Sequence, residues 1–212
     1  DNNTTASNNT AVGYQALLSN STGNYSTAAG YQSLYLNTTG RNTAYGNGSL
    51  AANTTGSINT AIGDNSLVSN STGDYNTALG YQSLASNTTA SNNVAVGYQA
   101  LYDNTTGSAL TAIGTQALAN NTTAAYNTAV GFNALLTNTT GFNNTAVGGA
   151  SLRYNTTGTY NTTLGALTLD ANTIGRYNTA VGALSLQDNT TGECSTAFGY
   201  EALANNSTAS NN

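Results

Sequence analysis

The chain has 212 residues, only 5% of them charged, and a formal net charge of −5. It has no His for acid–base catalysis, and its only cations, Arg41, Arg153 and Arg176, are far apart in the sequence. Phosphate binding needs clustered Lys and Arg, and a membrane span needs about 20 apolar residues in a row, so we expect neither a nucleic-acid partner nor membrane insertion. We also expect no enzyme, no cofactor and no metal site, because the turns lack the regular Asp of calcium-binding repeats.

One 17-residue unit, first complete at residues 9–25, repeats along the chain. Its glycine recurs at a spacing of 17, with one spacing of 16 between Gly30 and Gly46. A fixed period of this size indicates a solenoid, in which each repeat packs only against its neighbours. The glycine column consists of Gly13, Gly30, Gly46, Gly63, Gly80, Gly97, Gly114, Gly131, Gly148, Gly165, Gly182 and Gly199.

The repeats predict a single array over residues 1–212. Residues 1–8 are the end of one repeat, twelve copies run from residue 9 to residue 211, and residue 212 begins another copy. The short copy lacks a residue near Gly40, where we expect a tighter turn. Residues 2–9 and 205–212 are nearly equal in sequence, which predicts a segment of a longer array or a subunit that stacks end to end in phase.

Each unit predicts one coil of a solenoid whose coils lie about 4.8 Å apart. Residues 10–14 alternate and include β-branched side chains, which predicts a short strand; residues 15–18 predict a second strand, and residues 20–23 predict a turn. The alternative is a helical turn at residues 14–19, as in leucine-rich repeats, whose units usually have about 20–29 residues. We therefore expect an all-β fold, a parallel β-solenoid (β-helix or β-roll) of about twelve 17-residue coils.

Two apolar columns are candidates for the core. One is Leu in every copy, and the other, which begins at Val12, is apolar but variable in size. We place Val12 inside with Leu17, which puts Ala11 and Gly13 on an outer face whose small residues suit close packing against another chain. The predicted core ladder consists of Leu17, Leu34, Leu50, Leu67, Leu84, Leu101, Leu118, Leu135, Leu152, Leu169, Leu186 and Leu203.

A column of Asn is as regular as the leucine column, and two hypotheses explain it. Most members begin Asn-X-Ser/Thr sequons, which are typical of glycosylated loops in exported proteins, so the first hypothesis is that the column is glycosylated. The second hypothesis is that the side-chain amides form hydrogen bonds from coil to coil as a buried ladder. Asn172 keeps the Asn without a sequon, and a spacing of about 4.8 Å leaves little room for a glycan on every coil, which favours the ladder. The column contains Asn20, Asn37, Asn53, Asn70, Asn87, Asn104, Asn121, Asn138, Asn155, Asn189 and Asn206. Further candidates for glycosylation are Asn24, Asn47 and Asn143.

Three other features allow a functional or a structural interpretation. The threonine column that begins at Thr10 resembles the hydroxyl rows of ice-binding solenoids, or it reflects β-propensity with hydroxyls bonded along the sheet. Cys194 has no partner base and is a variant of the column that begins at Tyr25. The tyrosines of that column stack on sugars, cover the turn as an aromatic stripe, or form a contact between subunits, and they are Tyr25, Tyr75, Tyr126, Tyr160 and Tyr177.

The sequence Asn-Thr-Ala-Val-Gly-Tyr-Gln-Ala-Leu at residues 9–17, followed by Asn-Ser/Thr-Thr-Gly, resembles a known repeat type. It is similar to tandem arrays in bacterial and phage surface-fibre and tail-fibre proteins, and to the head repeats of trimeric autotransporter adhesins, which form a left-handed β-roll. The likeness to the fibre arrays covers nearly the whole chain and implies a surface fibre. The likeness to the adhesin heads implies a left-handed winding of the coils. The period here is longer than that of the adhesin head.

These observations predict a structural subunit or segment of an extracellular filament, on a cell surface or a virion. We expect it to assemble with itself end to end through uncapped coils, with lateral contacts as a further possibility, and to carry covalent glycans on turn Asn or Thr residues. The alternative function is an adhesin or tail-fibre shaft that recognises glycans, and an ice-binding solenoid ranks below it.

Overall fold

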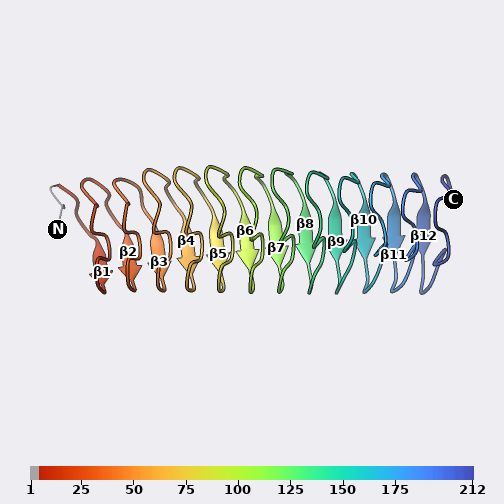
Figure 1. Ribbon diagram of the computed structural model, residues 1–212, viewed down its shortest axis with the longest axis horizontal. Helices are drawn as coiled ribbons and strands as arrows, with labels where there is room; N and C mark the ends of the chain where they lie inside the picture. Colours follow the sequence, from red (N-terminus) through yellow and green to blue (C-terminus); the bar gives the residue numbers. More distant parts are fainter. Residues whose placement is uncertain (1–4) are drawn as a thin grey trace.

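The structure, a computed structural model, describes residues 5–212. Twelve three-residue strands follow one another along a single axis, and this part of the chain contains no helix (Figure 1). The strands are β1 (Thr10–Val12), β2 (Thr27–Ala29), β3 (Thr43–Tyr45), β4 (Thr60–Ile62), β5 (Thr77–Leu79), β6 (Val94–Val96), β7 (Thr111–Ile113), β8 (Thr128–Val130), β9 (Thr145–Val147), β10 (Thr162–Leu164), β11 (Thr179–Val181) and β12 (Thr196–Phe198).

The strands form one parallel sheet in which each strand pairs only with its neighbours in sequence. The register keeps equivalent residues together, so that Thr111 pairs with Thr128 and Ala112 with Ala129 across β7 and β8. Parallel strands need a long return connection, and here the rest of each coil provides it. The prediction of an all-β parallel solenoid with about 17 residues per coil is therefore confirmed.

Each coil contains a single strand, so the predicted second strand at residues 15–18 is wrong, and so is the alternative helical turn at residues 14–19. Residues 14–19 form consecutive turns in which Gln15 and Leu17 have left-handed φ angles of 57° and 53°. Two left-handed residues this close together exclude both a strand and an α-helix. The turns nevertheless bond between coils, since the N–H of Leu17 donates to the carbonyl oxygen of Ser33 at 3.0 Å.

The expected position of Val12 inside the coil is also wrong, because the alanine column beside it faces the core. In β7, Ala112 is fully buried, whereas Ile113 is 40% exposed. The inner face of each strand packs against the leucine column, where a methyl group fits, while the outer face accommodates side chains from Ala to Phe. The alanines therefore cannot form the outer contact face that we expected of them. The buried alanines of this column are Ala28, Ala44, Ala61, Ala78, Ala95, Ala112, Ala129, Ala146, Ala180 and Ala197.

The glycine column marks a point where the backbones of consecutive coils approach each other closely. A Cβ atom added to Gly114 would lie 2.5 Å from the carbonyl oxygen of Gly131 in the next coil. The φ angles of the column range from 117° to 139°, a region that only glycine occupies readily. Both the spacing of the coils and the bend after each strand therefore require glycine here.

The short copy keeps the register because its missing residue is removed at a corner of the coil. Thr27 still pairs with Thr43 across the 16-residue step. In the other coils a non-glycine residue with a left-handed φ, such as Tyr25 at 60°, precedes the next copy. In the short copy Gly40 makes the turn with a φ of 96°, and Arg41 leads directly into the next copy. The tighter turn expected at this place is present.

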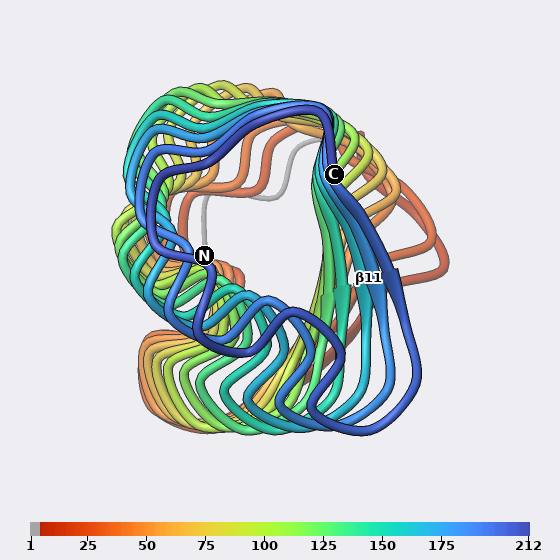
Figure 2. The same ribbon diagram turned by 90° about the vertical axis from the view of Figure 1, so that its right-hand side faces the viewer.

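Viewed along its axis, the molecule is a stack of coils, each rotated relative to the one before it (Figure 2). Strands that pair side by side twist relative to one another, which accounts for this rotation. As a result, the columns of equivalent residues wind gradually around the axis, and the outer face of the sheet winds with them.

Candidate functional sites: stacked columns and corner grooves

The leucine column forms the apolar centre of the coils. Its members from Leu34 to Leu186 are fully buried, whereas Leu203 in the last described coil is 40% exposed. Every member has a left-handed φ between 50° and 54°, a conformation that costs about 1–2 kcal/mol in a residue with a Cβ atom. Full burial of a leucine side chain contributes about 1.5–3 kcal/mol, so stacking offsets a strain that an isolated coil would have to bear alone.

Side-chain hydrogen bonds join the asparagine column into a continuous ladder. Asn70 donates from Nδ2 to Oδ1 of Asn53 at 2.8 Å and to the carbonyl oxygen of Gly73 at 3.0 Å, and its own Oδ1 accepts from Asn87 at 2.8 Å. The column is fully buried from Asn37 to Asn189. The predicted asparagine ladder is therefore confirmed, and each amide also closes the turn of its own coil.

The ladder uses the same nitrogen atom that N-glycosylation would modify. Both N–H groups of a ladder amide are engaged, and the next coil packs directly over it, so the folded coil leaves no space for a glycan there. The other candidate residues lie elsewhere: Asn47 and Asn143 are exposed, and Asn24 is half-buried with its Oδ1 accepting a hydrogen bond from the backbone N–H of Ser7 at 2.6 Å.

A second asparagine column, which the sequence interpretation missed, lies directly before the strands. Asn42 accepts a hydrogen bond at Oδ1 from the backbone N–H of Asn59 at 2.9 Å, and it donates from Nδ2 to the carbonyl oxygen of Gly56 at 2.8 Å. Nine of the twelve copies have Asn at this position, and Ser26, Leu110 and Ser195 replace it in the others. That regularity was visible in the sequence and indicates the same kind of ladder.

The outer face of the sheet carries one row of threonines and one row of apolar residues. Thr111 and Ile113 in β7 both point outward, and Ile113 is 40% exposed. Within the described chain, the hydroxyls of the threonine row have no hydrogen-bond partner in the protein, so they are not bonded along the sheet. The aligned pair of hydroxyl rows that an ice-binding face would use is not found here, since the second row is apolar.

Aromatic side chains form short stacks in two columns on the surface. In the column that begins at Tyr25, the rings of Tyr160 and Tyr177 stack with their centroids 5.2 Å apart, and Phe142 from the neighbouring column packs against Tyr160 edge to face at 5.4 Å. In the column that begins at Tyr14, that ring stacks on the ring of Tyr31 at 5.6 Å. Each ring of a stacked pair covers one face of its neighbour, which favours the aromatic stripe over sugar stacking on those covered faces.

Two of the three arginines are paired with carboxylates one coil away. Arg153 bonds Asp170 at 2.8 Å, and Arg176 bonds Glu193 at 2.8 Å. The hydrogen bond to Asp170 raises the pKa of Arg153 above its ordinary value, against the opposing effect of burial. The third arginine, Arg41, instead lies with its guanidinium over the ring of Tyr25, 5.2 Å from the centroid.

Two surface grooves lie at the corner that precedes the strands. The first has a volume of about 320 Å³ and is lined by Tyr25, Arg41, Thr43, Ile58, Asn59 and Thr60. The second has a volume of about 470 Å³ and is lined by Phe142, Thr157, Thr159, Tyr160, Ile174, Arg176, Tyr177 and Glu193. Both grooves combine aromatic, apolar and hydroxyl groups with an arginine.

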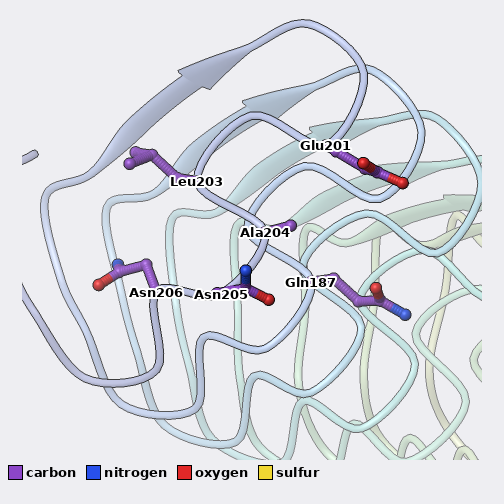
Figure 3. Close-up of a pocket in the computed structure, with 6 residues that line it drawn as sticks. All are labelled: Gln187, Glu201, Leu203, Ala204, Asn205 and Asn206. Carbon is purple, nitrogen blue, oxygen red and sulfur yellow. The ribbon is translucent and has the colours of Figure 1, made fainter.

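A larger hollow of about 670 Å³ lies at the last described coil, where Gln187 and Glu201 border it and Leu203 projects from the coil (Figure 3). It is lined by side chains of the last two described coils, among them Ala204, Asn205 and Asn206. Across residues 5–212 no three His, Cys, Asp or Glu side chains gather as a metal site would require, and Cys194 is an exposed free thiol.

No family model, no curated protein and no solved structure matches the chain. In the described part of the chain there is also no helix that is long and apolar enough to cross a membrane.

Proposed function

We propose that the protein is a structural rod segment of an extracellular fibre. One observation carries this proposal: the sheet and the ladders connect each coil only to the coils directly before and after it. A chain built in this way gains length with every added copy, while its cross-section stays constant. At about 4.8 Å per coil, twelve coils give a rod about 58 Å long.

The interactions also account for stiffness. Backbone hydrogen bonds, the leucine column and both asparagine ladders all join coil to coil along the rod, so bending the rod would strain several rows of contacts at once. The surface carries few charges, and exposed Asn47 and Asn143 are suitable acceptors for glycans that would keep such a fibre soluble. An extracellular location and the resemblance to surface-fibre arrays are part of the same proposal.

The rod is further proposed to extend by stacking coil on coil, whether within a longer chain or between chains. Leu203 in the last described coil is 40% exposed, and Oδ1 of Asn189 in the ladder is buried without a hydrogen-bond partner. A further coil in the same register would cover the leucine and would give the last ladder amides the environment that they have in the middle of the array.

The rod is tested by doubling the array, with a second copy of residues 9–211 inserted in phase after residue 211. Small-angle X-ray scattering is expected to show a maximum dimension that rises by about 58 Å with an unchanged cross-section. A compact globule would instead grow by only about a third in radius when its length doubles, and this result would contradict the rod.

Stacking between chains is tested separately by electron microscopy of concentrated protein, with Leu203→Asp as the variant. The native chain is expected to form filaments with an axial repeat of about 4.8 Å, and the variant is expected to remain as single rods because a charge would face the added coil. If the native chain stays as single rods at every concentration, stacking between chains is wrong, while the rod itself still stands.

A further inference from the structure

The one irregular coil of the array carries an unusual arginine. Arg41 lies in the 16-residue copy, directly after the left-handed Gly40, at a corner where the neighbouring copies have one more residue. The register continues through this copy, where Thr27 pairs with Thr43, and so does the ladder, where Asn53 donates to Asn37 at 2.9 Å. The missing residue therefore leaves the stacking of the coils unchanged, and its effect is confined to the groove beside Arg41.

Arg41 is the only arginine of the described chain without a carboxylate partner. Arg153 and Arg176 are each held by an acidic residue at 2.8 Å. The guanidinium of Arg41 lies over the ring of Tyr25 in a cation–π contact, and its N–H donors have no protein acceptors among residues 5–212. A planar guanidinium with free donors matches the two oxygens of a carboxylate.

The rest of the groove suits a sugar ring. Ile58 is 50% exposed and offers an apolar surface for C–H groups, and the hydroxyls of Thr43 and Thr60 point outward without protein partners among residues 5–212. The volume of about 320 Å³ is at the lower end of ligand pockets and corresponds to one or two sugar units.

Other classes of ligand fit less well. A peptide strand would need a free sheet edge, but β3 is paired on both sides, with β2 and β4. A nucleic acid would need several cations, and Arg41 stands alone in this groove. We propose that the groove at the short coil binds a carboxylate-bearing sugar unit of an acidic polysaccharide, with Arg41 on the carboxylate and the Thr43 and Thr60 hydroxyls on the ring hydroxyls.

The second corner groove provides an internal control. It shares the column of Tyr25 and has more aromatic surface, but it lies on the turn side of that column, and Glu193 occupies the guanidinium of Arg176 and adds a negative charge. A carboxylate would therefore be repelled there. The proposal thus predicts one acidic-sugar site in the array, at the short coil, although arginine and tyrosine occur together in both grooves.

Isothermal titration calorimetry and NMR shift mapping on the full chain test the site. The probes are an oligouronate, the same oligosaccharide with its carboxyl groups reduced to alcohols, and a sulfated neutral oligosaccharide. The native chain is expected to bind the oligouronate, with shifts confined to Tyr25, Arg41, Thr43 and residues 58–60. Arg41→Gln is expected to weaken this binding about tenfold or more, because the carboxylate loses its paired donors, while Arg176→Gln leaves it unchanged.

Three results would each overturn the proposal: no binding of the oligouronate, equal binding by Arg41→Gln, or equal binding of the reduced probe. Equal binding of the sulfated probe would overturn the assignment to a carboxylate. Arg41 makes no ladder contact, so Arg41→Gln should retain the circular dichroism and the rod dimensions of the native chain. A change in either would show that Arg41→Gln had disturbed the fold, and Arg41→Lys is then the variant that tests the site. Lysine keeps the charge but not the paired donors, so binding of the oligouronate by Arg41→Lys as tight as by the native chain would contradict the proposal.

Discussion

Asn121 donates from Nδ2 to Oδ1 of Asn104 at 3.0 Å, and these two residues are 17 positions apart in the chain. The same amide donates to the carbonyl oxygen of Ala124 in its own coil at 3.0 Å. One side chain therefore fixes both the shape of a turn and the stacking of the next coil. This double role explains why the asparagine column, unlike most surface positions of the repeat, is invariant.

We expect Asn121→Ala to destabilise the array strongly. It leaves Oδ1 of Asn104 without its side-chain donor and one of the two Nδ2–H groups of Asn138 without its acceptor, and each buried polar group left unpaired costs about 1–3 kcal/mol. Asn120→Ala is the matched control, since Asn120 is exposed and its replacement is expected to change stability by less than about 0.5 kcal/mol. Urea unfolding followed by circular dichroism measures both, and equal stabilities of the two variants would contradict the role of the ladder.

Leu135→Ala is expected to cost about 2–5 kcal/mol, because the side chain is fully buried and its neighbours above and below cannot collapse into the space. The adjacent Leu136 is only half-buried, so Leu136→Ala should cost clearly less. Thermal unfolding of the two variants gives the comparison. A loss at Leu136 that matched the loss at Leu135 would mean that the leucine column is not the main core.

Gly148→Ala and Gly149→Ala test the close approach of the coils. A Cβ atom on Gly148 would meet the carbonyl group of Gly165, and the residue has a φ of 134°, so we expect a loss of about 4 kcal/mol or more. A Cβ atom on Gly149 meets no atom within 4 Å, and this variant should be tolerated. Hydrogen exchange of the coils around residue 148 should increase in the first variant alone; protection unchanged in both would argue against tight coil contact.

The folded chain is expected to accept N-glycans at Asn143 but not at Asn138. Both belong to sequons, yet Asn143 is exposed, whereas Asn138 is buried and uses Nδ2 for hydrogen bonds to Asn121 at 3.0 Å and to Gly141 at 2.9 Å. Purified folded protein can be treated with an oligosaccharyltransferase and analysed by peptide mass spectrometry. Comparable occupancy at both residues would show that the ladder opens readily, and Asn143→Gln serves as the control for site assignment.

The period alone was sufficient to predict the solenoid, because identical residues at a fixed spacing can stack only if the chain makes one coil per repeat. The inward face of the strand was predicted wrongly, although the sequence contained the necessary signal. Ala occupies one column in eleven of twelve copies, whereas the Val12 column varies from Ala to Phe, and size is constrained inside a coil rather than outside it.

The turns could not be predicted in the same way. Leu17 and Gln15 have left-handed backbone angles that their own preferences disfavour, and only the packing of neighbouring coils stabilises them. The corner grooves could not be predicted from the sequence either, since they depend on which side chains from different coils come together. Arg41 was visible as a rare cation, but its contact with Tyr25 across the short copy appears only in three dimensions.

The corner before each strand accepts changes of sequence and length that leave the pairing of the strands intact. Gly40 and Arg41 show that a residue can be lost there while the pairing of β2 with β3 is undisturbed. The same corner elsewhere holds tyrosine, isoleucine, alanine or cysteine with little change in backbone angle. Side chains at this corner can therefore change independently in each coil while the stacked coils keep their structure. For the same reason, a loop or a label can be inserted at this corner by protein engineering.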